Sequence, residues 1–234
     1  MHYYFIWNGT NSTNNGIRLQ SMPQVVRPEE RVSHVTIPGR AGELTLTEGS
    51  NIFESYIQTV PIVVDSLAHV KAAETWLKGS GTVTFCCEPE RKQNARIINA
   101  VTFQKHSRNS SWWEAEVQFY CEPLKEAVTT EDDIEITSSG TTVTNPGDVI
   151  ARPLIVITGS GAITIRAGGQ QISLTGVESG WQVDSDLEWV MDAQGNPLAG
   201  VYTGEFPLLG TGTKAVQFTG SVTKLTITPR WRYI

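Results

Sequence analysis

The chain has 234 residues, of which 39% are hydrophobic and 18% are charged. This composition is typical of a folded globular protein and unlike that of a disordered chain. Its formal net charge of −6 at pH 7 argues against general binding to nucleic acids or anionic membranes, which favour basic surfaces.

Three further exclusions come from the pattern of residues. No apolar run approaches the roughly 18 residues of a membrane-spanning helix, so membrane insertion is not expected. The start of the chain lacks the basic region and the small-residue cleavage site of a signal peptide. Three cysteines, an odd number, indicate a reducing compartment rather than a disulfide framework.

In the first half of the chain, apolar and polar side chains alternate with the period of β-strands. The clearest case is residues 112–122, where Trp113, Val117 and Phe119 share one face and glutamates occupy the other. Residues 94–105 have a similar pattern, and a long polar loop joins the two segments, which predicts a long hairpin. Further strands are predicted at 2–7, 32–37, 43–47, 55–64 and 82–87.

One segment, at about residues 66–78, has helical periodicity instead. Asp65 or Ser66 is suited to accept the free amides of the first turn. The apolar stripe of this predicted helix, which we expect to cover an edge or a face of the sheet, consists of Leu67, Val70, Ala73, Trp76 and Leu77.

The composition changes after Pro123. Residues 125–148 are acidic and rich in threonine, and they contain too few large apolar residues to predict a core element. Residues 1–125 carry 12 basic and 12 acidic side chains, whereas residues 126–234 carry 6 and 12. We therefore predict two domains, 1–125 and 126–234.

The second domain contains short apolar segments separated by glycines, with turns about every 8–12 residues, as in an all-β sandwich. Ser160 falls in what is predicted to be a hairpin turn between two of these segments. The predicted strands are 152–158, 162–167, 170–176, 181–185, 188–192, 214–220 and 224–233.

The cysteines do not form a recognisable metal site. Cys86 and Cys87 are adjacent within a predicted strand, so their side chains point to opposite faces and cannot bind one metal ion together. The spacing of zinc sites is absent, and the four histidines are scattered. We predict that Cys86 and Cys87 are buried, unreactive strand residues, with Cys87 and Cys121 facing inward. No metal site, cofactor or catalytic residue is predicted.

Carboxylates are the strongest candidates for chemistry. Glu114 and Glu116 lie on one face of a strand about 6–7 Å apart, near the separation used by glycosidases. Asp184, Asp186 and Glu188 repeat this spacing, but the segment lacks the glycine that a calcium-binding loop requires at its sixth position. A solvated outer face explains both sets better, so we do not expect an enzyme.

The order of these segments resembles that of the siphophage distal tail proteins, the Dit family, over nearly the whole chain. In the first half the resemblance rests on IPGRAGELTLTEG (37–49), WLKGSGTVTF (76–85), NARIINAVTFQK (94–105) and WWEAEVQFYCEP (112–123). In the second half it rests on Asn145-Pro146-Gly147, Ala151-Arg152-Pro153-Leu154, Ile157-Thr158-Gly159-Ser160-Gly161, Val183-Asp184-Ser185, Gly195-Asn196-Pro197, Phe206-Pro207-Leu208 and PRWRYI (229–234).

The resemblance implies a mainly β protein. Its N-terminal domain would be a β-sandwich with one helix and a long hairpin, and its C-terminal domain a galectin-like β-sandwich. It also implies a structural role in a phage or prophage tail tip or baseplate, as a hexameric ring between the tail tube and the tail-associated hub or lysin protein. Receptor-binding proteins would be further partners. The protein would be located in the virion and assembled in the host cytoplasm.

A ring requires an interface between two different surfaces of each subunit. The net charge of zero of the first domain suits such an interface. The turn between the predicted strands 32–37 and 43–47 is expected to protrude, because it contains a proline and two glycines. The guanidinium of Arg40 could bind a carboxylate or carbonyls of a neighbour. The candidate interface residues are Pro38, Gly39, Arg40 and Gly42.

Two alternatives belong to other functional classes. The first is a carbohydrate-binding β-sandwich module for adhesion to the host surface, with Trp181 and Trp189 as an aromatic platform. Both tryptophans lie in apolar segments and are predicted to be core residues, which argues against it. The second alternative is a glycosidase that uses Glu114 and Glu116.

Overall fold

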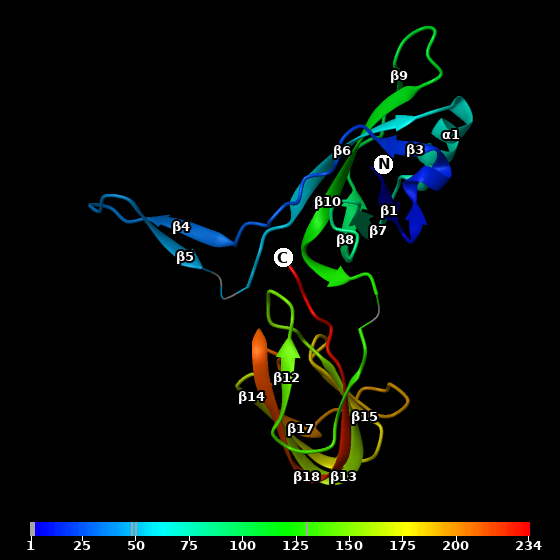
Figure 1. The fold of residues 1–234 in the computed structure, drawn as a ribbon. Helices are drawn as coiled ribbons and strands as arrows, with labels where there is room; N and C mark the ends of the chain where they lie inside the picture. Colours follow the sequence, from blue (N-terminus) through cyan, green and yellow to red (C-terminus); the bar gives the residue numbers. More distant parts are fainter. Residues whose placement is uncertain (1–2, 48, 50, 130) are drawn as a thin grey trace. The chain divides into compact units, whose positions relative to one another are not determined.

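The computed structural model describes residues 3–47, 49, 51–129 and 131–234. The protein is mainly β, as predicted, and it divides into two compact units, Met1–Val128 together with Ile234, and Thr129–Tyr233 (Figure 1). Within the described residues, no helix combines the length and the apolar character needed to cross a membrane.

The first unit is built on one curled antiparallel sheet with the strand order β2-β1-β7-β8-β10-β6-β3, and β9 also pairs with β10. A separate two-stranded ribbon is formed by β4 and β5. The elements are β1 (Phe5–Trp7), β2 (Thr10–Asn11), the 3-10 helix η1 (Ser12–Asn15), β3 (Ile17–Leu19), β4 (Val32–Thr36), β5 (Glu43–Thr47), β6 (Tyr56–Val64), α1 (Leu67–Trp76), β7 (Ser80–Phe85), β8 (Arg91–Ile97), β9 (Gln104–Lys105) and β10 (Trp113–Ala127).

The core of this unit follows the alternation in β10. Val117, Phe119 and Cys121 are buried on one face of the strand, as predicted. The ring of Phe119 contacts three aromatic rings, those of Phe5, Trp7 and Phe85, at centroid distances of 5.3–5.6 Å. The aromatic cluster therefore joins the strands β1, β7 and β10 into one core.

The helix α1 begins after Ser66, whose Oγ accepts a hydrogen bond from the His69 N–H at 3.3 Å. Val70 and Ala73 are buried against the core, and the indole of Trp76 stacks on the ring of Phe5 at 5.6 Å. The predicted stripe is thus correct except for Leu67, which is exposed because it lies in the first helical turn at the solvent side.

Two predictions for the first unit are wrong. Residues 94–105 do not form one strand, because β8 ends at Ile97 and pairing with β10 resumes only at Gln104. The strand β7 ends at Phe85, and the next residues turn toward β8, since the Glu88 N–H bonds to the Phe85 carbonyl at 3.0 Å. Cys86 and Cys87 therefore lie in a turn and are only partly buried.

The second unit is one curled antiparallel sheet with the order β11-β18-β13-β14-β17, to which β12 adds through β18 and β15 through β13. The short strand β16 pairs with β15. Its strands are β11 (Ile134–Ile136), β12 (Thr141–Asn145), β13 (Leu154–Ala167), β14 (Gln170–Val177), β15 (Trp181–Asp184), β16 (Trp189–Met191), β17 (Tyr202–Gly204) and β18 (Gly212–Thr228).

The central strands of this unit are longer than predicted. Residues 152–158 and 162–167 belong to one strand, β13, and Ser160 lies within it opposite Ser221 of β18 rather than in a hairpin turn. The pairing of β13 with β18 shifts register on both sides of Ser160, and these irregularities let each strand bend and continue. The predicted strands 214–220 and 224–233 likewise merge in β18, which ends at Thr228.

The acidic segment 125–148 also differs from its prediction. It supplies the strands β11 and β12, both of which pair with β18. The side chains of Ile136 and Val143 are buried, with 1% and 4% of their surface exposed. One apolar side chain in each strand is therefore enough for the core when the strand pairs with the long neighbouring strand β18.

Candidate functional site

The most exposed element of the first unit is the arm, residues 32–47, which comprises β4, β5 and the tip between them. In Figure 1 the arm extends away from the curled sheet of its unit. Its two strands pair with each other from Val32↔Thr47 to Thr36↔Glu43. A two-stranded ribbon of this kind is marginally stable on its own, so its surface is suited to contact another protein surface.

The tip of the arm contains the four candidate interface residues. The Arg40 N–H donates to the Ile37 carbonyl at 3.1 Å, which closes a turn with Pro38 and Gly39 at its two central positions. Gly39 has a φ of +82°, the conformation that the third residue of a type II turn requires. A Cβ added at Gly39 or Gly42 would contact nothing within 4 Å, so the tip is open to solvent.

The arm has one apolar face. From the register of the ribbon, Val35, Leu44 and Leu46 lie on the same side, and Val35 and Leu46 are 41% and 47% exposed. The opposite side is polar except for Val32, and there His34 contacts Thr45, with 3.3 Å between Nδ1 and Oγ1. The arm thus presents aliphatic side chains to solvent on one side.

At the base of the arm, the two segments that lead into it are bonded to each other. Arg31 forms an ion pair with Glu54, in which Nε lies 2.7 Å from Oε1, and the Arg31 N–H donates to the Ile52 carbonyl. A β-bridge joins Glu30 to Phe53, whose side chain is buried. These contacts give the arm a defined exit from its unit.

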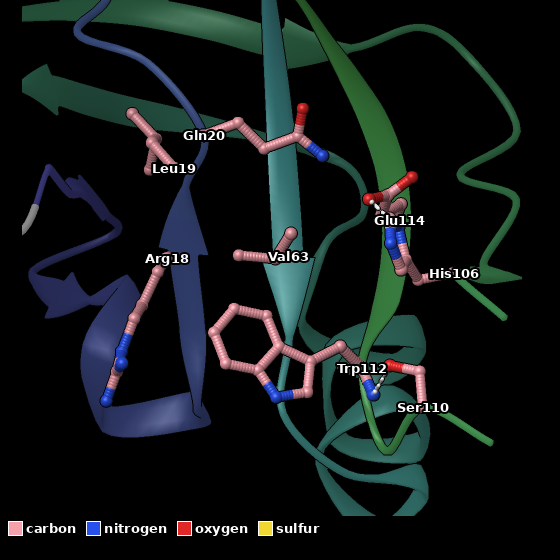
Figure 2. Close-up of a pocket in the computed structure, with 8 residues that line it drawn as sticks. All are labelled: Arg18, Leu19, Gln20, Val63, His106, Ser110, Trp112 and Glu114. Carbon is pink, nitrogen blue, oxygen red and sulfur yellow. Dashed lines mark hydrogen bonds and ion pairs between the residues drawn. The ribbon is translucent and has the colours of Figure 1, made fainter.

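A cavity of about 630 Å³ lies in the same unit, at the edge of the sheet that is formed by β3 and β6 (Figure 2). The indole of Trp112 lies beside Val63 of β6, and Arg18 of β3 borders the same space. The His106 ring bonds to the Glu114 carboxylate, with 2.7 Å between Nδ1 and Oε1. The cavity combines an aromatic surface with a cation and a hydrogen-bonded histidine–glutamate pair, as in a protein-binding depression.

The structure does not bring the two glutamates of the glycosidase hypothesis together in this cavity. Glu114 borders it, but Glu116 does not; its Oε1 instead accepts a hydrogen bond from Gln118 at 3.0 Å. Both carboxylates are thus engaged with neighbouring side chains on the outer face of β10.

The thiols of Cys87 and Cys121 are held in their protonated form. Burial raises the pKa of the Cys121 thiol to about 12, and burial together with the charge of Glu88 raises the pKa of Cys87 above its ordinary value. Such thiols are poor nucleophiles and poor metal ligands. Among the residues that the structure describes, no group of three or more His, Cys, Asp or Glu side chains could hold a metal ion.

The second unit has a groove formed by two adjoining depressions of about 570 and 420 Å³, which share Glu188 and Tyr202. Trp189 of β16 borders it and is 53% exposed, so the prediction that this tryptophan is a core residue is wrong. The reason is that β16 is a short strand at the margin of the sheet, paired with β15 on one side and joined on the other only to residues 197–198. Trp181 is buried, as predicted.

The carboxylate of Asp184 stabilises the turn between β15 and β16. Its Oδ1 accepts hydrogen bonds from the N–H groups of Asp186 and Leu187 at 2.9 and 3.1 Å. The guanidinium of Arg230 donates to both carboxylate oxygens at 2.8 and 2.9 Å. Asp184 is therefore a structural anchor, and it is unavailable as a ligand in the calcium-like pattern of Asp184, Asp186 and Glu188.

The comparisons with known proteins identify the fold. No protein-family model and no curated protein sequence matches the chain. The structure is similar to the crystal structure of SPP1 Dit (gp 19.1), described as a paradigm of the hub adsorption apparatus in phages that infect Gram-positive bacteria. The TM-score is 0.78 over 100% of both chains, with 17% sequence identity. The expected resemblance to the Dit family is confirmed at the level of the fold.

The sequence located the tip of the arm, but it did not reveal the cavity beside Trp112 or the groove beside Trp189. The polar loop before Trp112 indicated only a long hairpin, and Trp189 was assigned to the core from its apolar neighbours. The one local signal for the groove was the run of polar residues at 184–186, separated from Trp189 by two residues, which is typical of a turn rather than of a continuous strand.

Proposed function

We propose that this protein is a structural component of a phage tail tip or baseplate, in which its first unit forms a closed hexameric ring between the tail tube and the tail-associated hub protein. The fold shared with SPP1 Dit supports the tail-tip role. The arm is the observation that carries the ring, because it is a separate two-stranded ribbon that exposes aliphatic side chains on one face.

The arm is suited to contact a second copy of the chain. Its apolar face, with Val35 and Leu46, would become buried against a neighbouring subunit, and Arg40 at the tip would bind a carboxylate or carbonyls there. Each subunit would both offer its arm and receive another, which is the head-to-tail arrangement that closes a ring.

The arm alone is too small to hold a ring together, since stable interfaces bury more than about 1,000 Å² in total. The sheet edges and the cavity beside Trp112 are further surfaces in the same unit that could share the contact. The ring would be assembled in the host cytoplasm and would then join its partners, which include receptor-binding proteins. In the finished virion it would be part of the tail.

The proposal is tested by measuring the mass of the full chain with light scattering over a range of concentrations. The wild type should reach six times the monomer mass. Leu46→Glu should shift the mass toward the monomer, because it places a charge on the apolar face of the arm. Thr45→Glu is the matched control, since it changes the adjacent residue on the polar face.

A second pair of variants tests the tip. Arg40→Glu should weaken assembly, whereas Arg166→Glu, which reverses an exposed charge in the second unit, should leave it unchanged. A wild type that stays monomeric at all concentrations, or an assembly that Leu46→Glu and Thr45→Glu affect equally, would overturn the proposal.

A further inference from the structure

We propose that the groove beside Trp189 in the second unit binds the pyranose ring of a neutral saccharide. This inference does not depend on ring formation, and it rests on three features of the groove: an exposed aromatic face, a buried hydroxyl without a partner, and a balanced pair of charged side chains.

Trp189 provides the aromatic face. The backbone of this residue is fixed by the pairing of β16 with β15, in which Trp189 lies opposite Asp184. Because its side chain has only two rotatable bonds, an indole held in this way loses little conformational entropy when a ligand stacks on it. The C–H groups on one side of a pyranose ring are apolar and match such a surface.

Ser185 supplies an independent indication of a ligand. The residue is fully buried and lines the groove, yet its Oγ has no hydrogen-bond partner among the residues that the structure describes. A buried hydroxyl without a partner is unfavourable, and most such groups in proteins are satisfied by protein, water or ligand. A sugar hydroxyl that enters the groove would satisfy it.

The charged side chains of the groove favour a hydroxyl-rich ligand without a net charge. Arg152 donates to the Glu188 carboxylate at 3.3 Å, and both side chains are largely exposed. Together they offer donors and acceptors next to each other, and a sugar hydroxyl uses both. Glu205 also lines the groove, so acidic groups outnumber Arg152 there, and an anionic ligand would be repelled.

The groove is preformed and of suitable size. Asp184 holds the turn that carries Ser185 and Glu188, through its bonds to two backbone N–H groups and to Arg230. The adjoining depressions, of about 570 and 420 Å³, fall within the range of small-molecule sites. The turn is therefore held in place before a ligand arrives, and binding requires the local movement that brings a sugar hydroxyl within reach of the buried Ser185 Oγ.

The experiment uses the full chain on an array of neutral hexose- and N-acetylhexosamine-terminated oligosaccharides, together with sialylated and sulfated ones. We expect binding to a subset of the neutral glycans. For the best of these, titration by calorimetry should show that Trp189→Ala weakens binding by about tenfold or more, as for a buried aromatic anchor. Trp189→Phe should restore part of the affinity.

Trp112→Ala is the matched control, because Trp112 is similarly exposed, at 49%, but lies in the first unit. It should leave glycan binding unchanged. Ser185→Ala should weaken binding without lowering the melting temperature, since it removes a hydroxyl that has no partner in the free protein. The mass in solution should be the same for the wild type and for the Trp189 and Ser185 variants, which keeps this test separate from that of the ring.

The inference is overturned if no neutral glycan binds, if only the acidic glycans bind, or if Trp189→Ala and Trp112→Ala have equal effects on binding.

Discussion

Replacing Asp184 with asparagine should destabilise the second unit substantially. The carboxylate is almost completely buried, with 4% of its side chain exposed, and it accepts two hydrogen bonds from Arg230 and two from backbone N–H groups. Removal of one partner of a buried pair costs about 3–5 kcal/mol. Because the Arg230 side chain is 30% exposed, and asparagine keeps one acceptor oxygen, we expect a loss of about 2–3 kcal/mol.

Differential scanning calorimetry should show this loss as a drop of roughly 10 °C in the melting temperature of the second unit, with the first unit unaffected. Asp192→Asn is the matched control, because that carboxylate also accepts backbone hydrogen bonds but lies in an exposed turn. The reasoning is refuted if the two substitutions lower the melting temperature equally.

The effect should also depend on pH. Burial raises the pKa of Asp184, but hydrogen bonds from Arg230 and from the Leu187 N–H outweigh it and hold the pKa below the ordinary value of 3.8. A carboxylate with a lowered folded-state pKa contributes stability above its unfolded-state pKa. The difference between wild type and Asp184→Asn should therefore be complete above about pH 4 and vanish as the pH falls through the folded-state pKa.

Three further outcomes are expected. Glu88→Ala should lower the unfolding free energy of the first unit by about 3 kcal/mol in urea titrations, because Lys125, only 4% exposed, loses its 2.7 Å partner; Glu88→Ala combined with Lys125→Met should recover most of it. Cys87→Ser should cost roughly 1–3 kcal/mol and Cys86→Ser little, and equal effects would contradict the contact of Cys87 with the core. Limited proteolysis, read by mass spectrometry, should cut first at residues 128–133, after the paired end of β10 and before β11, and leave two stable fragments; a first cut within 82–122 would count against a mobile joint between the units.

The parts of the fold that could be predicted are those in which local periodicity decides burial. In β10 the alternation of Val117, Phe119 and Cys121 with polar residues requires one buried face, whatever its neighbours are. The helix α1 could be predicted for the same reason, since its stripe and its Ser66 cap are both local features.

The parts that could not be predicted depend on distant residues. Glycines 159 and 161 are typical of turns, but they also fit a bend in a strand that is paired on both sides, and only the length of β18 decides between the two. Ile136 is buried because it pairs with Leu225, far along the sequence. Cys86 and Cys87 continue the apolar pattern of β7, and the charged residues that end the strand come only after them.

The candidate sites differ in the same way. The tip of the arm is encoded by Pro38 and Gly39, whose backbone preferences specify a turn without any help from the rest of the protein. The exposure of Trp189 is set by the position of β16 at the margin of the sheet, which no local pattern reveals.

The pairing of β11 with β18 has a consequence for how the protein is made. Ile134 pairs with Ile227, so the first strand of the second unit cannot find its partner until nearly all of that unit has left the ribosome. The first unit, in contrast, has all its pairings within Met1–Val128 and can fold while the rest is still being translated. Nascent chains would thus carry a finished first unit tethered to an incomplete second one, and β11 and β12 would remain exposed to chaperones until β18 emerges.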